Sequence, residues 1–362
     1  MTDIKSLTFE ELSAALEAEG CEGYRASQVF RWLYKDRVKD FSEMTNLSAA
    51  LRSRLSELFF ISKPEVLRAQ VSSDGETAKL LYGLADGNAV ETVFMKYKHG
   101  NTVCISTQAG CRMGCRFCAS TKRGLKRNLS VSEMLDQIIF TEERFCDKIS
   151  NIVLMGTGEP LDNFDNVVRF ISMATDEKCL GLSIRGISLS TCGLVERIEQ
   201  LRRMRLGLTL SVSLHAPNDE IRRKIMPVAA KYKIDDLLRE VKAYADFTKR
   251  RVAIEYTLIK GVNDSDANAR ELAGRLRGIM AHVNLIPLNP SKECEWERPS
   301  PARINAFSEV LKHERISVTV RRELGTDIDA ACGQLRLHYE NEEKRGALER
   351  SDTLCGYTEQ VT

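Results

Sequence analysis

Cys111-Arg112-Met113-Gly114-Cys115-Arg116-Phe117-Cys118 is the stretch that decides both the fold and the chemistry of this chain. Its CxxxCxxC spacing places three thiols on one tight loop, within reach of one metal centre. A closed zinc or iron–sulfur site usually takes four protein ligands, so three ligands leave one coordination position for a small molecule. The loop therefore favours a chemically active metal centre over a purely structural metal site.

Length and composition limit the class of protein around this loop. The 362 residues allow one large domain and a smaller one, and a hydrophobic share of 43% can build a sizeable core. The sequence has no long apolar run and no signal-peptide pattern at its start, so we expect no membrane helix and a cytosolic location. The 11 cysteines, odd in number and irregular in spacing, argue against a disulfide framework and indicate metal or redox chemistry for a subset.

Positive charge is clustered although the net charge is only +2. The runs are Lys122–Arg123, Lys126–Arg127, Arg202–Arg203–Arg205, Arg222–Arg223–Lys224, Lys249–Arg250–Arg251 and Arg321–Arg322. Such runs form either solvated faces or contacts to phosphates. Several lie near the motifs described below, which favours the second interpretation for those runs.

From about residue 100 the pattern alternates between strands and helices. The expected strands are 102–106, 151–155, 185–190, 207–214, 252–258, 282–286 and 316–320, and the expected helices are 130–146, 163–174, 193–203, 234–247, 266–280 and 301–313. Repeated βα units predict an α/β fold with a parallel sheet and helices outside it. Their number favours a full barrel or a partial (βα)6 barrel.

The remaining segments have other patterns. Helical spacing of apolar residues predicts an N-terminal helical domain over 1–70. Two β-prone stretches around Asp86-Gly87 predict a hairpin of 77–84 and 89–97, within an extension of 71–99. The barrel core then covers 100–338, and 339–362 is expected to be a flexible polar tail.

Unusual residues follow the expected strands at their carboxyl ends, where a βα barrel gathers its active-site groups. They are the cysteine loop, Gly156-Thr157-Gly158-Glu159-Pro160, Ser190-Thr191, Ser213-Leu214-His215, Asn289 and Cys332. Taken singly, Glu159 could be a surface turn acid, His215 a structural histidine and Asn289 a turn residue. Their convergence on one rim predicts a ligand site there.

This constellation resembles the radical-SAM superfamily, and more closely its RlmN/Cfr family of RNA methyltransferases, from about Tyr24 to Leu335. The motifs that carry the resemblance are Glu91-Thr92-Val93, Cys111 to Cys118, Gly124 to Leu129, Gly156 to Leu161, Ser213 to Asn218 and Asp327 to Leu335. CxxxCxxC alone indicates the superfamily, whereas the last motif, with Cys332, is specific to the family. One departure is Thr157, where the family often has methionine.

The resemblance implies a role for each matching residue. Cys111, Cys115 and Cys118 would hold a [4Fe–4S] cluster, and S-adenosylmethionine (SAM) would chelate the fourth iron. The matching SAM-binding positions are Gly158, Glu159, Ser190, Ser213, Leu214, His215 and Asn289. Cys332 would carry a methyl group, Cys104 would later resolve it, and Glu91 would accept a proton.

The implied reaction is methylation of carbon 2 of an adenine in RNA, namely adenine 2503 of 23S ribosomal RNA, with adenine 37 of transfer RNA as a second candidate. That ring carbon is electron-poor, so a radical route replaces direct transfer. One SAM methylates the Cys332 thiolate, a second is cleaved to a radical that activates this methyl group, and Cys104 frees the product as a transient disulfide. The resemblance also implies a flavodoxin or ferredoxin as electron donor, a monomer without membrane contact, and RNA contacts by the N-terminal domain and by Lys122, Arg123, Lys126 and Arg127.

Three alternatives remain at this point. A Cfr-like enzyme would methylate carbon 8 of the same adenine; the residues Asn218-Asp219 and the turn at 156–161 favour carbon 2. A non-enzymatic iron–sulfur or zinc RNA-binding protein would explain the three cysteines and the cations but not Cys332. A radical-SAM enzyme with another substrate is the third.

Overall fold

The computed structural model describes most of the chain. The described residues are 1–289, 294–321, 328, 335–336 and 339. Cys332 and the predicted tail beyond Tyr339 lie outside them.

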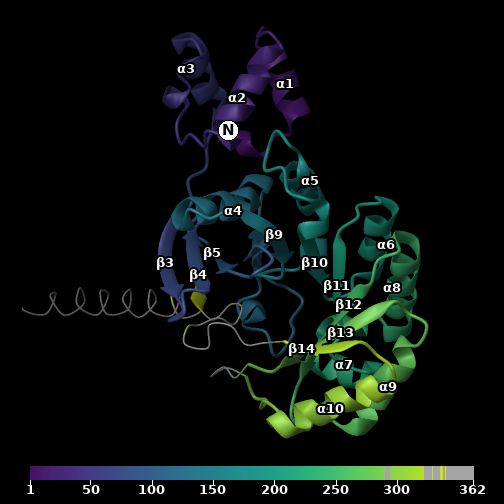
Figure 1. Cartoon of the computed structure of the whole chain (residues 1–362). Helices are drawn as coiled ribbons and strands as arrows, with labels where there is room; N and C mark the ends of the chain where they lie inside the picture. Colours follow the sequence, from purple (N-terminus) through teal and green to yellow (C-terminus); the bar gives the residue numbers. More distant parts are fainter. Residues whose placement is uncertain (290–293, 322–327, 329–334, 337–338, 340–362) are drawn as a thin grey trace, which may run out of the picture.

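A ten-stranded sheet forms the body of the molecule, and seven of its strands run parallel (Figure 1). In spatial order they are β6 (Asn101–Cys104), β9 (Ile149–Leu154), β10 (Ile187–Thr191), β11 (Thr209–Ser213), β12 (Val252–Leu258), β13 (Ala281–Pro287) and β14 (Val318–Val320). The helices between them are α4 (Val131–Phe145), α5 (Phe164–Thr175), α6 (Val195–Arg203), α7 (Asp219–Ile225) with α8 (Ile234–Thr248), α9 (Asp266–Leu276) and α10 (Pro301–His313). The expected partial (βα)6 barrel is thus confirmed, with β14 as a seventh parallel strand.

The two faces of these strands differ in chemistry because successive side chains of a strand point to opposite faces. Leu189, Leu210 and Leu285 are fully buried in the core beneath the outer helices. On the inner face, Ser213 is paired in register with Glu255, and Glu255 with Asn284. A polar inner face is suited to binding a ligand.

Local sequence signals explain where the helices begin. Ser130 caps α4: its hydroxyl accepts from the N–H of Glu133, and the Glu133 carboxylate accepts from the N–H of Ser130. This reciprocal capping box satisfies two N–H groups that have no partner within the helix. None of the helices in the described part of the chain combines the length and apolarity needed to span a membrane.

The N-terminal module consists of α1 (Phe9–Ala18), α2 (Tyr24–Tyr34) and α3 (Ala49–Leu58), with β1 (Thr2–Asp3) pairing β2 (Phe59–Phe60). A buried ion pair fixes it to α4: Lys5 Nζ lies 2.5 Å from Asp136 Oδ1. Ser62 completes the contact, since its hydroxyl donates to Asp136 Oδ2 at 2.6 Å and its carbonyl accepts from Lys5. The module therefore sits firmly on the barrel.

The prediction of helical structure up to residue 70 is wrong at its end, because Glu65–Val71 form strand β3. Helix α3 already ends at Leu58, and Pro64, just before β3, lacks the N–H that a residue inside a helix donates. The predicted hairpin is confirmed as β4 (Thr77–Gly83) and β5 (Ala89–Met95). Together β3, β4 and β5 extend the barrel sheet, since β5 pairs antiparallel with β6.

Candidate active site

The cysteine loop lies between two short strands, β7 (Gln108–Gly110) and β8 (Leu125–Asn128), which pair with each other. The loop is held from both sides by backbone hydrogen bonds. The N–H of Cys111 donates to the carbonyl of Gly124 at 3.2 Å, and the N–H of Arg116 donates to the carbonyl of Ile225, at the end of α7, at 3.0 Å. Residues from two distant segments thus support the loop.

Two of the loop thiols, Cys111 and Cys115, lie in an environment that resists ionisation. Cys111 is buried, and Cys115 and Cys118 are half-buried. Burial raises the pKa of the Cys111 thiol to about 12, and the neighbouring thiol of Cys118 adds to the rise. Burial likewise raises the pKa of Cys115 well above its usual range. Thiols must lose a proton to bind a metal, so a cationic centre at the loop would stabilise the thiolates that the protein alone disfavours.

The donor set of the loop can be compared with the needs of two kinds of metal centre. Among the described residues, no three His, Cys, Asp or Glu side chains are arranged to hold one metal ion. A zinc ion needs its ligands around a single point, whereas a [4Fe–4S] cluster takes each cysteine on a different iron. The loop supplies three cysteines, which fits a cluster of this kind.

The Gly156–Glu159 turn packs tightly against the end of β6. A Cβ atom on Gly156 would lie 2.6 Å from the carbonyl oxygen of Ile105, and one on Gly158 would lie 2.6 Å from Cβ of Gln108. Gly158 also has φ of +110°, a conformation that side chains rarely adopt. Both glycines are thus required by contacts within the protein, because a side chain at either position would collide with its neighbours.

Glu159 is placed at the rim as predicted, but its carboxylate turns into the protein. The two oxygens accept from the N–H of Leu161 at 3.0 Å and from the N–H of Cys192 at 2.7 Å. Burial raises the pKa of this carboxyl, and these hydrogen bonds oppose the rise. The side chain links β9 to β10, so a ligand ammonium would meet a carboxylate that already has partners.

Ser190 and Ser213 come together at the carboxyl ends of β10 and β11. Their hydroxyl oxygens are 3.5 Å apart, on the polar inner face of the sheet. Beyond β11, the N–H groups of Leu214 and His215 both donate to the carbonyl of Glu255. Neighbouring strands therefore set the spacing of these four rim positions.

His215 is a structural residue at the centre of the rim. Its Nδ1 accepts from the N–H of Thr257 at 2.9 Å, and its φ is +58°. Burial lowers the pKa of its imidazole to about 3, so the ring is neutral at physiological pH. The ring also meets Phe117 of the cysteine loop edge-on, with centroids 5.0 Å apart. Phe117 therefore packs against the rim within the protein.

Asn289 follows β13 at the same end of the sheet. It is exposed, and the N–H of the preceding Leu288 donates to the carbonyl of Leu258 on β12. All seven predicted SAM positions therefore lie on the loops and strand ends of one rim. Cys332 lies outside the described residues, so its predicted place on this rim stays a prediction.

Glu91 belongs to a buried charged cluster on β4 and β5. Its Oε2 lies 3.1 Å from Nζ of Lys79, and both side chains are almost completely buried. Its Oε1 accepts from the N–H of Arg336 at 2.7 Å. Cys104 is paired with Val93, two residues beyond Glu91, so Cys104 and Glu91 point to the same face of the sheet.

Two groups near the loop were not singled out by the sequence. Cys192 stands in no sequence motif. Burial raises the pKa of its thiol, and the nearby groups Glu159 and Cys115 raise this pKa further. Arg222, expected in a solvated or phosphate-binding run, is completely buried. In the sequence, the only sign of their role was that they follow the strands β10 and β11, whose ends form the rim.

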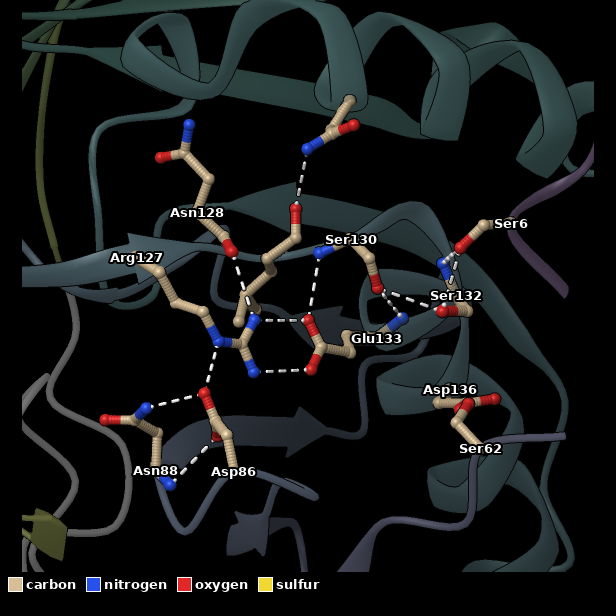
Figure 2. A network of polar contacts seen from close by, with 12 residues as sticks. Ser6, Ser62, Asp86, Asn88, Arg127, Asn128, Ser130, Ser132, Glu133 and Asp136 are labelled. Atoms are coloured by element: carbon tan, nitrogen blue, oxygen red, sulfur yellow. Dashed lines mark hydrogen bonds and ion pairs between the residues drawn. The ribbon is translucent and has the colours of Figure 1, made fainter. Parts of the chain in front are cut away.

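Arg127 was expected to contact RNA, but it is engaged within the chain (Figure 2). Its guanidinium donates twice to Glu133 at 2.8 Å and also pairs with Asp86 in the turn of the β4–β5 hairpin. The side chain therefore ties the extension to β8 and α4. Lys126, beside it, is exposed.

Two family models match the chain. The model of the ribosomal RNA large subunit methyltransferase N-terminal domain matches residues 2–61, which make up the N-terminal module. The model of the radical SAM superfamily matches residues 105–273, which span the parallel sheet from the end of β6 into α9.

Known proteins resemble the chain along nearly its whole length. The probable dual-specificity RNA methyltransferase RlmN of Lachnoclostridium phytofermentans is 52% identical over 338 residues, covering 93% of this chain and 95% of that protein. Its namesake in Clostridium novyi is 47% identical over 339 residues, covering 94% and 99%. The crystal structure of a radical SAM methyltransferase from Sphaerobacter thermophilus is 43% identical with a TM-score of 0.88, covering 92% of this chain and 99% of that one.

Proposed function

The chain belongs to the RlmN family of radical-SAM RNA methyltransferases, and from this premise we propose that it methylates carbon 2 of adenine 2503 in 23S ribosomal RNA and of adenine 37 in transfer RNA. Family membership makes it an enzyme that uses a [4Fe–4S] cluster and SAM, which excludes the non-enzymatic binding protein. The words dual-specificity in the names of its relatives support two RNA substrates. Finding 8-methyladenosine in place of 2-methyladenosine would favour the Cfr-like alternative.

We assign the cluster to Cys111, Cys115 and Cys118, and SAM to the rim beside it. When bound, the cluster supplies the electron for the reductive cleavage of SAM, the radical chemistry that an electron-poor ring carbon requires. Ser190 and Ser213 offer hydroxyls that can bind SAM, and the glycine turn shapes the wall of the same rim. Their common position at the carboxyl ends of parallel strands supports this assignment.

Three residues of the chain would carry out the transfer to RNA. The Cys332 thiolate accepts a methyl group from one of two SAM molecules used per turnover, as a good nucleophile. After the methyl carbon has bonded to the ring, Glu91 takes the C2 proton. Once the unpaired electron of the adduct has returned to the cluster, the Cys104 thiolate would attack the sulfur of Cys332. The S–S bond forms as the bond from this sulfur to the methylene carbon breaks, and the carbon takes up a proton to become the methyl group of the released base.

The hydrogen bond between Glu91 and the N–H of Arg336 is the observation that carries this proposal. It brings the segment that follows Cys332 in the sequence onto the sheet face shared by Glu91 and Cys104.

The partners follow from the same chemistry. RNA must present an unstacked adenine to the rim, and the N-terminal module with Lys122, Arg123 and Lys126 is our candidate for the surrounding phosphates. The cluster and the disulfide both need reduction, so we place the enzyme in the cytosol with a flavodoxin or ferredoxin as donor. We propose that it acts as a monomer.

The test is nucleoside analysis after anaerobic reconstitution with iron, sulfide and SAM. The full chain should produce 2-methyladenosine in both RNAs, and Cys332→Ala should produce none. Cys104→Ala should accumulate RNA joined covalently to the protein, because the resolving thiol is missing. Cys146→Ala, at an exposed cysteine after α4, is the matched control and should retain activity. Methylation by Cys332→Ala would overturn the assignment.

A further inference from the structure

Arg222 on α7 is the largest completely buried side chain of the described chain. Its three donor groups reach backbone carbonyls at the rim: Leu214 at 3.2 Å, Tyr232 at 3.1 Å and Cys192 at 2.7 Å. Within the described residues, no carboxylate lies within ion-pair distance of it. Among the described residues the guanidinium is therefore hydrogen-bonded but forms no ion pair.

A buried charge without a counter-charge is unfavourable by several kcal/mol, on the order of the values found when one partner of a buried pair is removed. Burial lowers the pKa of the Arg222 guanidinium, yet an arginine side chain stays protonated in proteins. The hydrogen bonds to neutral carbonyls offset only part of the free-energy cost of removing the guanidinium from water. The arrangement is one that a nearby anion would complete.

The surroundings of Arg222 show which neighbouring groups could carry such a negative charge. The acidic groups whose charge acts on Arg222 are Cys192, Cys115 and, more weakly, Asp219. Arg222 is in turn the cation that acts on Cys115, whose other charged neighbours are Cys118, Cys111 and Glu159. These thiols carry no charge in the protein alone, so the negative charge that Arg222 would face is that of thiolates bound to a cluster.

The backbone joins α7 to the same loop. The N–H of Arg116 donates to the carbonyl of Ile225, three residues after Arg222. A Cβ on Gly114 would lie 3.4 Å from Pro227, in the 3₁₀ turn that follows α7. The cysteine loop therefore rests on the segment that carries Arg222, which fixes the separation of charge and loop.

We propose that Arg222 is a positioning residue that supplies the buried positive charge facing the iron–sulfur cluster and thereby raises its reduction potential. The inference rests on the proposed assignment of the cluster to Cys111, Cys115 and Cys118. Uptake of one electron makes the cluster one unit more negative, and a fixed cation nearby stabilises that state relative to the oxidised one. Net charge and burial are established determinants of iron–sulfur potentials.

Variants at position 222 separate charge from hydrogen bonding. Arg222→Gln keeps amide donors and removes the charge, whereas Arg222→Lys keeps the charge and loses the planar fork. Arg223→Gln is the matched control, because Arg223 is the exposed neighbour on the same helix. All are made in the full chain and reconstituted anaerobically, and iron, sulfide and the midpoint potential from an EPR-monitored titration are measured.

At the wild-type midpoint potential, the reduced-to-oxidised ratio of the Arg222→Gln cluster should be about tenfold lower, which is a shift of about 59 mV for a one-electron couple. Arg222→Lys and Arg223→Gln should stay near the wild-type potential. Loss of iron by Arg222→Gln with retention by Arg222→Lys would also support the proposal, since the two differ in charge.

An unchanged potential in Arg222→Gln would overturn the proposal, as would an equal shift in Arg222→Lys. Failure of both variants to fold would assign Arg222 to the scaffold alone and overturn it as well. A wild-type chain that takes up no cluster would contradict the cysteine assignment instead, so the two failures are distinguishable.

Discussion

The carboxylate of Glu91 accepts a hydrogen bond of 2.7 Å from the backbone N–H of Arg336, which lies 245 residues later in the chain. Leu335, next to it, is completely buried against Leu81 and Ala89 of the β4–β5 hairpin. One polar and one apolar contact thus anchor the segment after Cys332 to the extension. The extension does more than complete the sheet, because it holds the end of the family-specific motif.

Replacing Leu335 by aspartate should release this anchor. A carboxylate cannot be buried against Leu81 and Ala89 without a partner, so the segment should leave the hairpin. We expect RNA methylation to fall more than tenfold while iron content and cleavage of SAM stay at the wild-type level. Both are measured after reconstitution. Met204→Asp, at an exposed apolar residue, is the control. Unchanged methylation in Leu335→Asp would show that the anchor has no part in the reaction.

Lys79→Met should destabilise the fold strongly, because it leaves the Glu91 carboxylate buried without its cation. Removal of one partner of a buried pair lowers the free energy of unfolding by about 3–5 kcal/mol. Urea unfolding measures the loss. The double variant Lys79→Met with Glu91→Leu should recover part of it, since neither charge of this pair then remains buried. Lys96→Met removes the cation of the exposed pair with Asp147 and should change little.

The parallel sheet was predictable because its alternating βα pattern is local in the sequence. The rim residues were predictable for a related reason: each follows a strand, and parallel strands end on one side. Strand β3, the burial of Arg222 and the internal contacts of Arg127 could not be predicted in this way. Arg222 stands in a run of three cations that has the composition of a solvated surface, and only the packing of α7 shows that one of them is buried. Arg127 likewise depends on Asp86, which the fold brings from the hairpin.

Gly158→Ala should disturb the rim more than an ordinary glycine substitution. The new Cβ would lie 2.6 Å from Cβ of Gln108, and φ of +110° adds strain of about 1–3 kcal/mol. We expect a lower unfolding free energy and weaker SAM binding, measured by urea unfolding and calorimetry. Gly75→Ala is the control: its φ of +69° is also positive, but no atom lies within 4 Å of its Cβ. Equal effects on SAM binding would contradict the role of Gly158 in shaping the rim.

Lys126 and Arg127 should respond differently to removal of their charge. Lys126→Gln should weaken RNA binding and reduce the slope of log affinity against log salt by about 0.7, the value for one contact to single-stranded nucleic acid. Arg127→Gln should instead lower the urea midpoint, because Glu133 and Asp86 lose their shared partner (Figure 2). Fluorescence anisotropy over a series of salt concentrations measures the first effect. A reduced salt slope in Arg127→Gln with normal stability would assign that residue to RNA after all.

His215 should make stability depend on pH below about 6.5. Burial, followed by the charge of Arg222, lowers the pKa of its imidazole from 6.5 to about 3. Between these values the unfolded chain binds a proton that the folded chain excludes, so the free energy of unfolding should decrease as pH falls, by at most about 1.4 kcal/mol per pH unit. Above pH 6.5 both states are neutral, and His215 should contribute no pH dependence.

His215→Asn keeps an acceptor for the N–H of Thr257 and tolerates the positive φ, but it cannot titrate. The difference in unfolding free energy between wild type and His215→Asn, measured from pH 7 to pH 5, cancels the other titrating groups. As pH falls, the free energy of unfolding of the wild type should decrease more than that of His215→Asn. If the two free energies change in parallel with pH, the fold does not hold the imidazole neutral.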